Sequence, residues 1–160
     1  MPELKYAKYI VKTTEHITPP PNPEQTKMIE DQKKAGNSVE WNVFLKMQDS
    51  VVKGSFGMGG SWVMSLKGTK PVQMELAHTH DCDEILGFVG SDPYNPRELG
   101  GEIELWLEDE KHIINESCLI FIPRGMKHCP LFFRKVDKPI FSYGATINSN
   151  YERPWEGKFK

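Results

Sequence analysis

The chain has 160 residues, of which 38% are hydrophobic and 26% charged, and its formal net charge is −2. This length fits one domain with a substantial hydrophobic core. The weak acidic balance, without a basic stripe, excludes a nucleic-acid-binding surface, and the apolar stretches are too short to cross a membrane.

Residues 1–39 differ from the rest of the chain and predict an N-terminal arm. A short strand is expected at residues 4–11, followed by a stiff, proline-rich segment at 16–23. Residues 24–35 have the composition of a helix, which Gly36 ends. We expect this arm to pack on the main domain or on a partner subunit, although a flexible tail is the competing interpretation.

From residue 40 the hydrophobic pattern approaches a period of two, which indicates β-strands. Glycine, proline, asparagine and aspartate separate the apolar runs, as expected for frequent turns. An all-β barrel or sandwich is therefore predicted over residues 40–150, with a C-terminal tail at 151–160. The expected strands cover residues 41–47, 61–66, 72–80, 84–89, 102–108, 118–122, 128–133 and 140–147.

Three potential metal ligands lie close together in the sequence, at His78, His80 and Glu84. Residues two apart in a strand point to the same face, so the two imidazoles can approach one ion. The turn-prone residues 81–83 allow the chain to reverse and to bring Glu84 back from the neighbouring strand. Asp81 and Asp83 are expected to cap this turn, although one of them replaces Glu84 if that strand shifts its register.

A third imidazole, His128, follows a Pro123-x-Gly125 turn and begins another apolar run. A single histidine on a strand is more often structural or exposed than a ligand, but this combination is far less common. Three imidazoles and one carboxylate form a plausible site for a divalent transition metal. We therefore predict that His78, His80, Glu84 and His128 bind one ion.

The sequence His78-x-His80-x-x-x-Glu84, followed by Pro123-x-Gly125-x-x-His128, resembles the two metal-binding motifs of the cupin superfamily. The resemblance covers residues 60–148. It implies an all-β fold, a double-stranded β-helix or jelly-roll barrel that holds one metal, here with an N-terminal arm containing a short helix. Three positions depart from the usual motifs: Ser117 and Val72 replace glycines, and Phe132 replaces an asparagine. These positions shape turns and packing, so the departures leave the ligands intact.

Strand alternation predicts which other side chains surround the site. Met74 and Phe88 share a face with the ligands on their own strands. Trp62 and Tyr143 are further candidates for the substrate pocket, because small neighbouring residues leave room for a ligand. Cys129 follows His128 directly and is expected to point away from the metal.

A divalent Fe, Mn, Ni, Co or Zn ion in such a site can keep open positions for water, oxygen or a substrate. The sequence thus predicts a metal-dependent enzyme acting on a small oxygen-rich molecule, with Glu84 as ligand and proton acceptor. Similarity to cupins permits dioxygenase-like, isomerase or lyase chemistry. A non-catalytic metal-bearing domain that binds or senses a small molecule is the alternative, and a purely structural metal is a third possibility.

The partners predicted are a small-molecule ligand and a second copy of the chain. Strand edges and apolar outer faces of small barrels are often covered in a homodimer, and the N-terminal arm or residues 151–160 could contribute to this cover. The N-terminus lacks the apolar core of a signal peptide. Together with an odd number of cysteines, Cys82, Cys118 and Cys129, this indicates a cytoplasmic protein with reduced thiols.

Overall fold

The computed structural model describes residues 5–12 and 22–147. This part contains a short 3-10 helix at Ala7–Tyr9, one α-helix, α1 (Pro23–Lys34), and nine strands. The strands are β1 (Ser38–Met47), β2 (Gly57–Lys67), β3 (Val72–Glu75), β4 (Glu84–Gly90), β5 (Glu98–Leu107), β6 (Glu110–Glu116), β7 (Cys118–Ile122), β8 (His128–Val136) and β9 (Ile140–Thr146).

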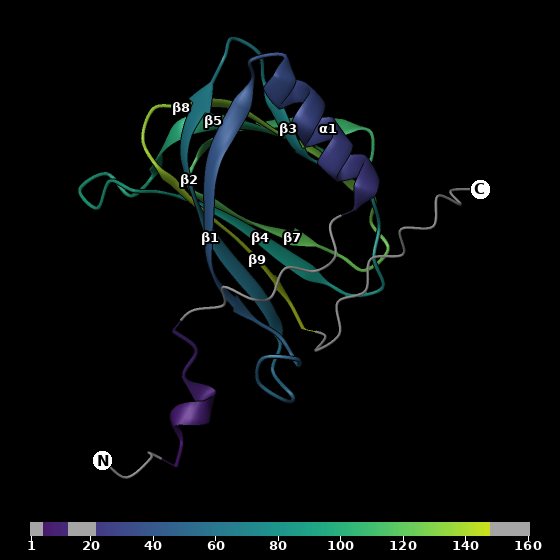
Figure 1. The fold of residues 1–160 in the computed structure, drawn as a ribbon, viewed down its shortest axis with the longest axis vertical. Helices are drawn as coiled ribbons and strands as arrows, with labels where there is room; N and C mark the ends of the chain where they lie inside the picture. Colours follow the sequence, from purple (N-terminus) through teal and green to yellow (C-terminus); the bar gives the residue numbers. More distant parts are fainter. Residues whose placement is uncertain (1–4, 13–21, 148–160) are drawn as a thin grey trace.

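The strands form two antiparallel sheets that face one another (Figure 1). One sheet has the order β1-β2-β9-β4-β7, and the other has the order β3-β8-β5-β6. From β2 to β5, and again from β6 to β9, the chain passes from one sheet to the other at each connection. This alternation produces a double-stranded β-helix, the jelly-roll barrel expected from the strand pattern.

The hydrophobic core fills the space between the sheets, because each strand turns alternate residues inward. Ile103 and Leu105 on β5, and Ile140 on β9, are completely buried. Their cluster extends along the barrel interior to Phe88 and Phe133. This packed core holds the strands in a fixed register and leaves one end of the interior for polar side chains.

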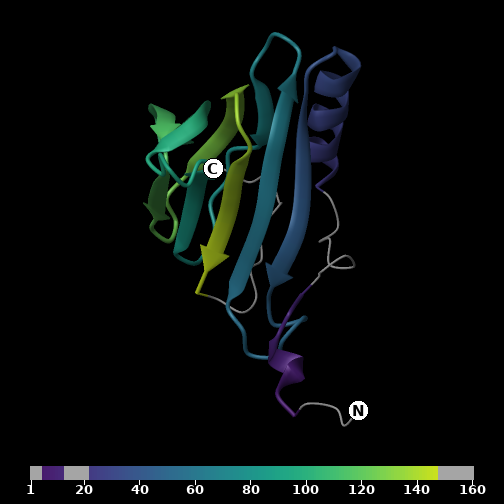
Figure 2. The same cartoon turned by 90° about the vertical axis from the view of Figure 1, so that its left-hand side faces the viewer.

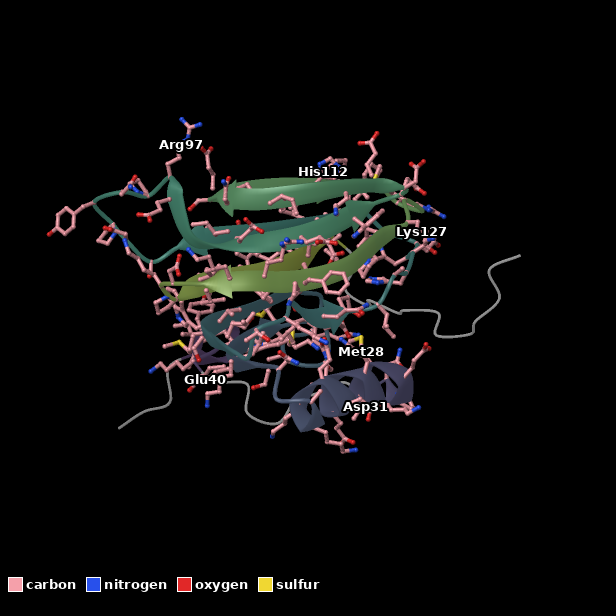
Figure 3. The ribbon with its side chains drawn as sticks, turned by 90° about the horizontal axis from the view of Figure 1, so that it is seen from above. Met28, Asp31, Glu40, Arg97, His112 and Lys127 are labelled. Carbon is pink, nitrogen blue, oxygen red and sulfur yellow. The ribbon has the colours of Figure 1, made fainter. Side chains whose placement is uncertain are left out.

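Helix α1 lies beside the edge strands of both sheets and contacts β1 and β3 (Figure 2). The helix begins at Pro23 because the Asn22 side chain accepts hydrogen bonds from the backbone N–H groups of Glu24 and Gln25. Figure 3 shows α1, with Met28 and Asp31, on the opposite side of the barrel from His112 on β6. Helix α1 of the arm therefore packs on its own barrel, whereas residues 5–10 are exposed.

Two glutamines of α1 satisfy backbone groups of β3 that have no neighbouring strand on that side. Gln32 Oε1 accepts from the Gln73 N–H at 2.8 Å, and Gln32 Nε2 donates to the Gln73 carbonyl at 2.9 Å. About two helical turns earlier, Gln25 Nε2 donates to the Met74 carbonyl at 2.8 Å. The helix thus protects a sheet edge that would otherwise be open to pairing with another chain.

Replacing Gln32 with alanine is expected to lower the free energy of unfolding by about 1–2 kcal/mol, because it leaves two backbone groups of β3 without their partners. Chemical denaturation of the metal-free protein measures this change. The matched control is Gln48→Ala, which removes a glutamine that bonds Ser50 in an exposed loop. Equal stability of both variants would contradict the proposed role of Gln32.

The strand pattern predicted most of the barrel, with three corrections. Described residues 5–11 contain a 3-10 helix and no strand, so the strand expected at 4–11 is wrong there. Strand β6 was not expected, because three of its seven residues are charged and its side chains are mostly exposed. Strand β3 ends at Glu75, earlier than the predicted residue 80. Among the described residues, no helix is both long and apolar enough to cross a membrane.

Candidate metal centre

The early end of β3 is what brings the two histidine motifs together. Beyond Glu75 the chain leaves the sheet ladder and pairs once more with β8, through an isolated bridge between His78 and His128. The N–H of each residue donates to the carbonyl of the other at 3.0 Å. Directly opposed residues in such a pair carry their side chains on the same face. The bridge therefore places two imidazoles side by side, with ring centroids 4.2 Å apart.

The turns next to the two motifs are also tied to one another. Asp83 Oδ1 accepts a hydrogen bond from the Arg124 N–H at 2.8 Å, and Asp81 forms an ion pair with the Arg124 guanidinium. The Gly125 N–H donates to the His80 carbonyl at 3.0 Å. Gly125 has a φ of 79°, a left-handed conformation that favours glycine in this turn. The two spare carboxylates thus stabilise the turns, as expected, and leave Glu84 in place.

Each of the three histidines is oriented by a backbone carbonyl. His78 Nδ1–H donates to the Leu76 carbonyl at 2.8 Å, and His80 Nδ1–H donates to the Cys82 carbonyl at 2.7 Å. His128 Nδ1–H donates to the Met126 carbonyl at 3.0 Å. Because a carbonyl oxygen only accepts, each Nδ1 carries the hydrogen and each Nε2 is left to face the interior. This is the arrangement by which proteins orient imidazole ligands toward a metal.

The Nε2 atoms of two histidines meet the carboxylate of Glu84 inside the barrel. Glu84 Oε2 lies 3.0 Å from His80 Nε2 and 3.4 Å from His128 Nε2. Ligand atoms of His80, Glu84 and His128 all lie within 4.8 Å of one another, and His78 and His128 belong to a second group of the same size. The structure therefore gathers all four predicted ligands, with His128 common to both groups.

The donor set fits a divalent transition metal. All four side chains are at least nine-tenths buried, and buried charges and imidazoles of this kind need a partner. The buried Nε2 of His128 faces Glu84 Oε2 across 3.4 Å, a long contact that a metal ion between the two atoms would replace. A neutral imidazole with a fixed tautomer and an inward lone pair is the form that binds metal. His78, His80, Glu84 and His128 would hold such an ion.

Glu84 is strongly biased toward its ionised form. Burial raises the pKa of Glu84, but hydrogen bonds and charge from His128 and His80 outweigh this effect and lower the pKa to about 2. A carboxylate that stays ionised inside a barrel is available as a metal ligand over the whole physiological pH range.

The lowered pKa of Glu84 predicts an acid-dependent loss of stability. Ionised Glu84 stabilises the metal-free fold above its ordinary pKa of 4.5, and this contribution is lost as the pH falls through about 2. Denaturation of the chelated protein from about pH 6 down to about pH 2 should show a wild-type advantage over Glu84→Gln that shrinks by up to about 3 kcal/mol. Every other carboxylate is shared by the two proteins, so parallel pH curves would contradict the expectation.

A cavity of about 310 Å³ opens beside the four side chains. Glu84, His78 and His128 border it, so a bound ion would be in contact with whatever enters. Most of the wall is apolar, with polar groups confined to a few positions, as is common for small-molecule sites. The apolar wall is formed by Val63, Met74, Leu86, Phe88, Leu131 and Phe133.

The four residues predicted to form the pocket differ in where the structure places them. Met74 and Phe88 line the cavity, as strand alternation predicts. Trp62 does not line it, and the prediction for this residue is wrong: its neighbours Ser61 and Val63 face inward, while Trp62 packs on Phe141. Tyr143 borders the cavity, but its ring lies over Gly87 and beside Phe141, on the outward side of the sheet.

Sequence reasoning missed several residues at the cavity. Trp41 and Lys46 of β1 line it, as does Glu75. The register of β1 against β2 shifts after Glu40 and again after Val43, so simple alternation along β1 could not show which side chains face inward. The charged Lys46 within an otherwise apolar run was the available signal.

Cys129 also lines the cavity, and the expectation that it points away from the metal is wrong. Its Sγ lies within 4.8 Å of ring nitrogens of both His78 and His128. A bulge in β8 is responsible. His128 pairs with Leu107 and Leu131 pairs with Leu105, so β8 contains one residue more than β5 between these two pairs. The extra residue interrupts the alternation of side chains between the two faces of the sheet.

The chain thus carries one motif on the β3–β4 connection and the start of β4, and the other on the β7–β8 connection and the start of β8. Their side chains meet inside the double-stranded β-helix. The fold is a jelly-roll barrel, and the paired motifs that it carries resemble those of cupins. The positions that depart from the usual motifs, Val72, Ser117 and Phe132, are not among the side chains that converge inside the barrel. Val72 packs in the core, the Ser117 hydroxyl accepts from the Gly90 N–H, and Phe132 pairs with Gln73. The barrel tolerates these changes because they alter the packing around the site and keep its donors.

Comparisons with solved structures find distant likenesses, including two that are named as cupins. They include KdgF from Halomonas sp., with 12% identity, a TM-score of 0.41, and 67% of this chain and 77% of that chain covered. A cupin protein from Bacteroides fragilis has 14% identity and a TM-score of 0.43, with 66% and 76% covered. The cupin domain of Schizosaccharomyces pombe Cnp3 has 11% identity and a TM-score of 0.44, with 69% and 61% covered.

No family model and no curated protein matches the chain. Likenesses this distant carry no information on substrate or reaction, so function has to be inferred from the residues of the site itself.

Proposed function

We propose that this cupin is a metal-dependent enzyme that acts on a small, oxygen-rich organic molecule. The observation that carries the proposal is the gathering of three imidazoles and Glu84 beside a cavity with room for a small ligand, whose wall includes His78, His128 and Glu84. A purely structural metal would need no such cavity beside its ligands. A bound divalent ion (Fe, Mn, Ni, Co or Zn) supplies Lewis acidity toward a substrate oxygen.

The chain's own side chains give the site its selectivity. The apolar wall excludes water from the reacting end of a substrate, while Lys46 and Glu75 offer charged groups elsewhere on the lining. Glu84 borders the cavity and is held ionised, so its carboxylate can accept a proton from a bound molecule. These features suit proton abstraction in isomerase or lyase chemistry and also dioxygenase-like oxidation.

The test is turnover by the chelated protein and by protein loaded with each of the five metals, against panels of ketoacids, catechols and sugar derivatives. Metal-dependent turnover that Glu84→Gln reduces supports the proposal. Absence of turnover with every metal would contradict it. In that case, a small molecule retained by the purified protein, detected by native mass spectrometry, would favour the alternative of a binding or sensing domain.

We also propose that the protein forms a homodimer through the outer face of its five-stranded sheet. Cross-strand pairs place Met58, Ala145, Ile85 and Phe121 in one row across this face. Leu119 lies in the next row and is 66% exposed, and Phe121 is 61% exposed. A patch of uncharged apolar side chains of this kind suits an isologous contact, because no like charges from these residues meet when two copies join.

Light scattering of the wild-type protein should give twice the mass of the chain. The double variant Leu119→Lys, Phe121→Lys should give the monomer mass, since it introduces like charges on both sides of the contact. The control is Ile113→Lys, which changes an exposed isoleucine on β6, outside this face. A monomeric wild-type protein would remove the proposal.

A further inference from the structure

Cys129 is placed where its sulfur can reach the same ion as the histidines. The residue is 3% exposed, and its Sγ and ring nitrogens of His78 and His128 all lie within 4.8 Å of one another. A second group with the same spacing, formed by His80, Glu84 and His128, has His128 in common with the group that contains Cys129. The two groups together contain five candidate donors.

The backbone directs Cys129 toward the cluster. Its φ is 64°, in the left-handed region that a cysteine rarely adopts, and it sits in the bulge of β8. Because of this bulge, His128 and Cys129 both line the cavity, although they are consecutive in a strand. Left-handed backbone at a non-glycine residue costs free energy, and such positions concentrate at functional sites.

The separations are compatible with one ion. Metal–sulfur bonds are about 2.3 Å and metal–nitrogen bonds about 2.1 Å, so two such donors on one ion are at most about 4.4 Å apart. Small side-chain rotations bring donors within 4.8 Å into this range. An independent observation also points to a ligand here, since the buried Nε2 of His128 is directed at Glu84 Oε2 across a long contact of 3.4 Å, which leaves it poorly satisfied.

We propose that Cys129 is a fifth ligand, which gives the metal of this cupin a mixed nitrogen, oxygen and sulfur coordination. The inference rests on the metal site of the proposed function. Formation of the metal–sulfur bond releases the thiol proton to solvent and changes the oxidation state of neither atom. A thiolate ligand favours Fe, Co, Ni or Zn over Mn, because softer donors prefer the softer ions.

Cys82 offers a matched control close to the same site. It is also buried, and its Sγ lies 3.6 Å from His80, but at Nδ1, the nitrogen that donates to the Cys82 carbonyl. Cys82 therefore lies on the side of the ring that faces away from Glu84. A thiol at this place is not expected to reach the metal.

The experiment is near-ultraviolet absorption of the full chain loaded with Co(II). Wild type and Cys82→Ser should show a thiolate-to-cobalt charge-transfer band, and Cys129→Ser should lose it while still binding cobalt, with an affinity lower by roughly 10–100-fold. Cobalt bound without this band, or a band that persists in Cys129→Ser, would overturn the assignment of Cys129 and leave the remaining metal site standing.

X-ray absorption at the cobalt edge of the wild-type protein reports the ligands without any substitution. One sulfur at about 2.3 Å supports the proposal. A shell of nitrogen and oxygen alone overturns it, even if Cys129→Ser does not fold. Failure of the wild-type protein to bind any cobalt would overturn the metal site itself and Cys129 ligation with it.

Discussion

Replacing His128 with alanine is expected to weaken binding of a divalent metal by more than about 100-fold, a larger loss than removal of a supporting hydrogen bond causes. His128 belongs to both groups of side chains that lie close enough together to bind one ion, so its loss removes a ligand from each group. Its backbone stays paired with His78 through two hydrogen bonds, which an alanine retains. The effect should therefore fall on the metal rather than on the register of β8.

Competition titration with a chromophoric chelator measures this affinity, and elemental analysis of the purified protein measures the metal content. His112→Ala is the control, because His112 is exposed on β6 on the far side of the barrel from α1. Equal metal content in the two variants would show that the histidine cluster does not bind the ion.

Replacing Ile103 with alanine is expected to lower the free energy of unfolding by about 2–5 kcal/mol. Ile103 is completely buried in the core on β5, between its partners Phe133 on β8 and Ile114 on β6. Removing its outer methyl groups leaves a cavity that the surrounding strands cannot close, because β5 is paired on both sides.

The same substitution at Ile113 provides the comparison. Ile113 pairs with Glu104 on the same hairpin but is 45% exposed, so Ile113→Ala should change stability by no more than about 0.5 kcal/mol. Thermal or denaturant unfolding of the chelated proteins gives both values. A small effect at Ile103 would mean that the core does not pack as the barrel requires.

The parts of the site that could be predicted are those that depend on the spacing of residues close together in the sequence. Short segments of the sequence were enough to identify the pair His78 and His80, the turn at residues 81–83 and the Pro123-x-Gly125 turn. The inward position of Glu84 and Phe88 followed from alternation, which holds along the regular strand β4. These inferences needed no knowledge of distant parts of the chain.

Alternation failed wherever a strand contains a bulge. The inward position of Trp41 arises from a register shift in β1, and that of Cys129 from a bulge in β8. Bulges depend on how a strand pairs with its neighbour, and this pairing joins residues far apart in the sequence. Trp62 illustrates the same limit, because small flanking residues suggested room for a ligand but could not show which face they occupied.

The amino-acid sequence by itself determined the all-β class, the helix before the barrel and the four side chains most suited to a metal, since these depend on periodicity and short-range spacing. Only the tertiary structure decided that His78 and His128 are bridged, that α1 protects the edge of β3 and that Cys129 joins the histidines. Each of these depends on contacts between residues distant in the chain, whose geometry is set by packing of the two sheets.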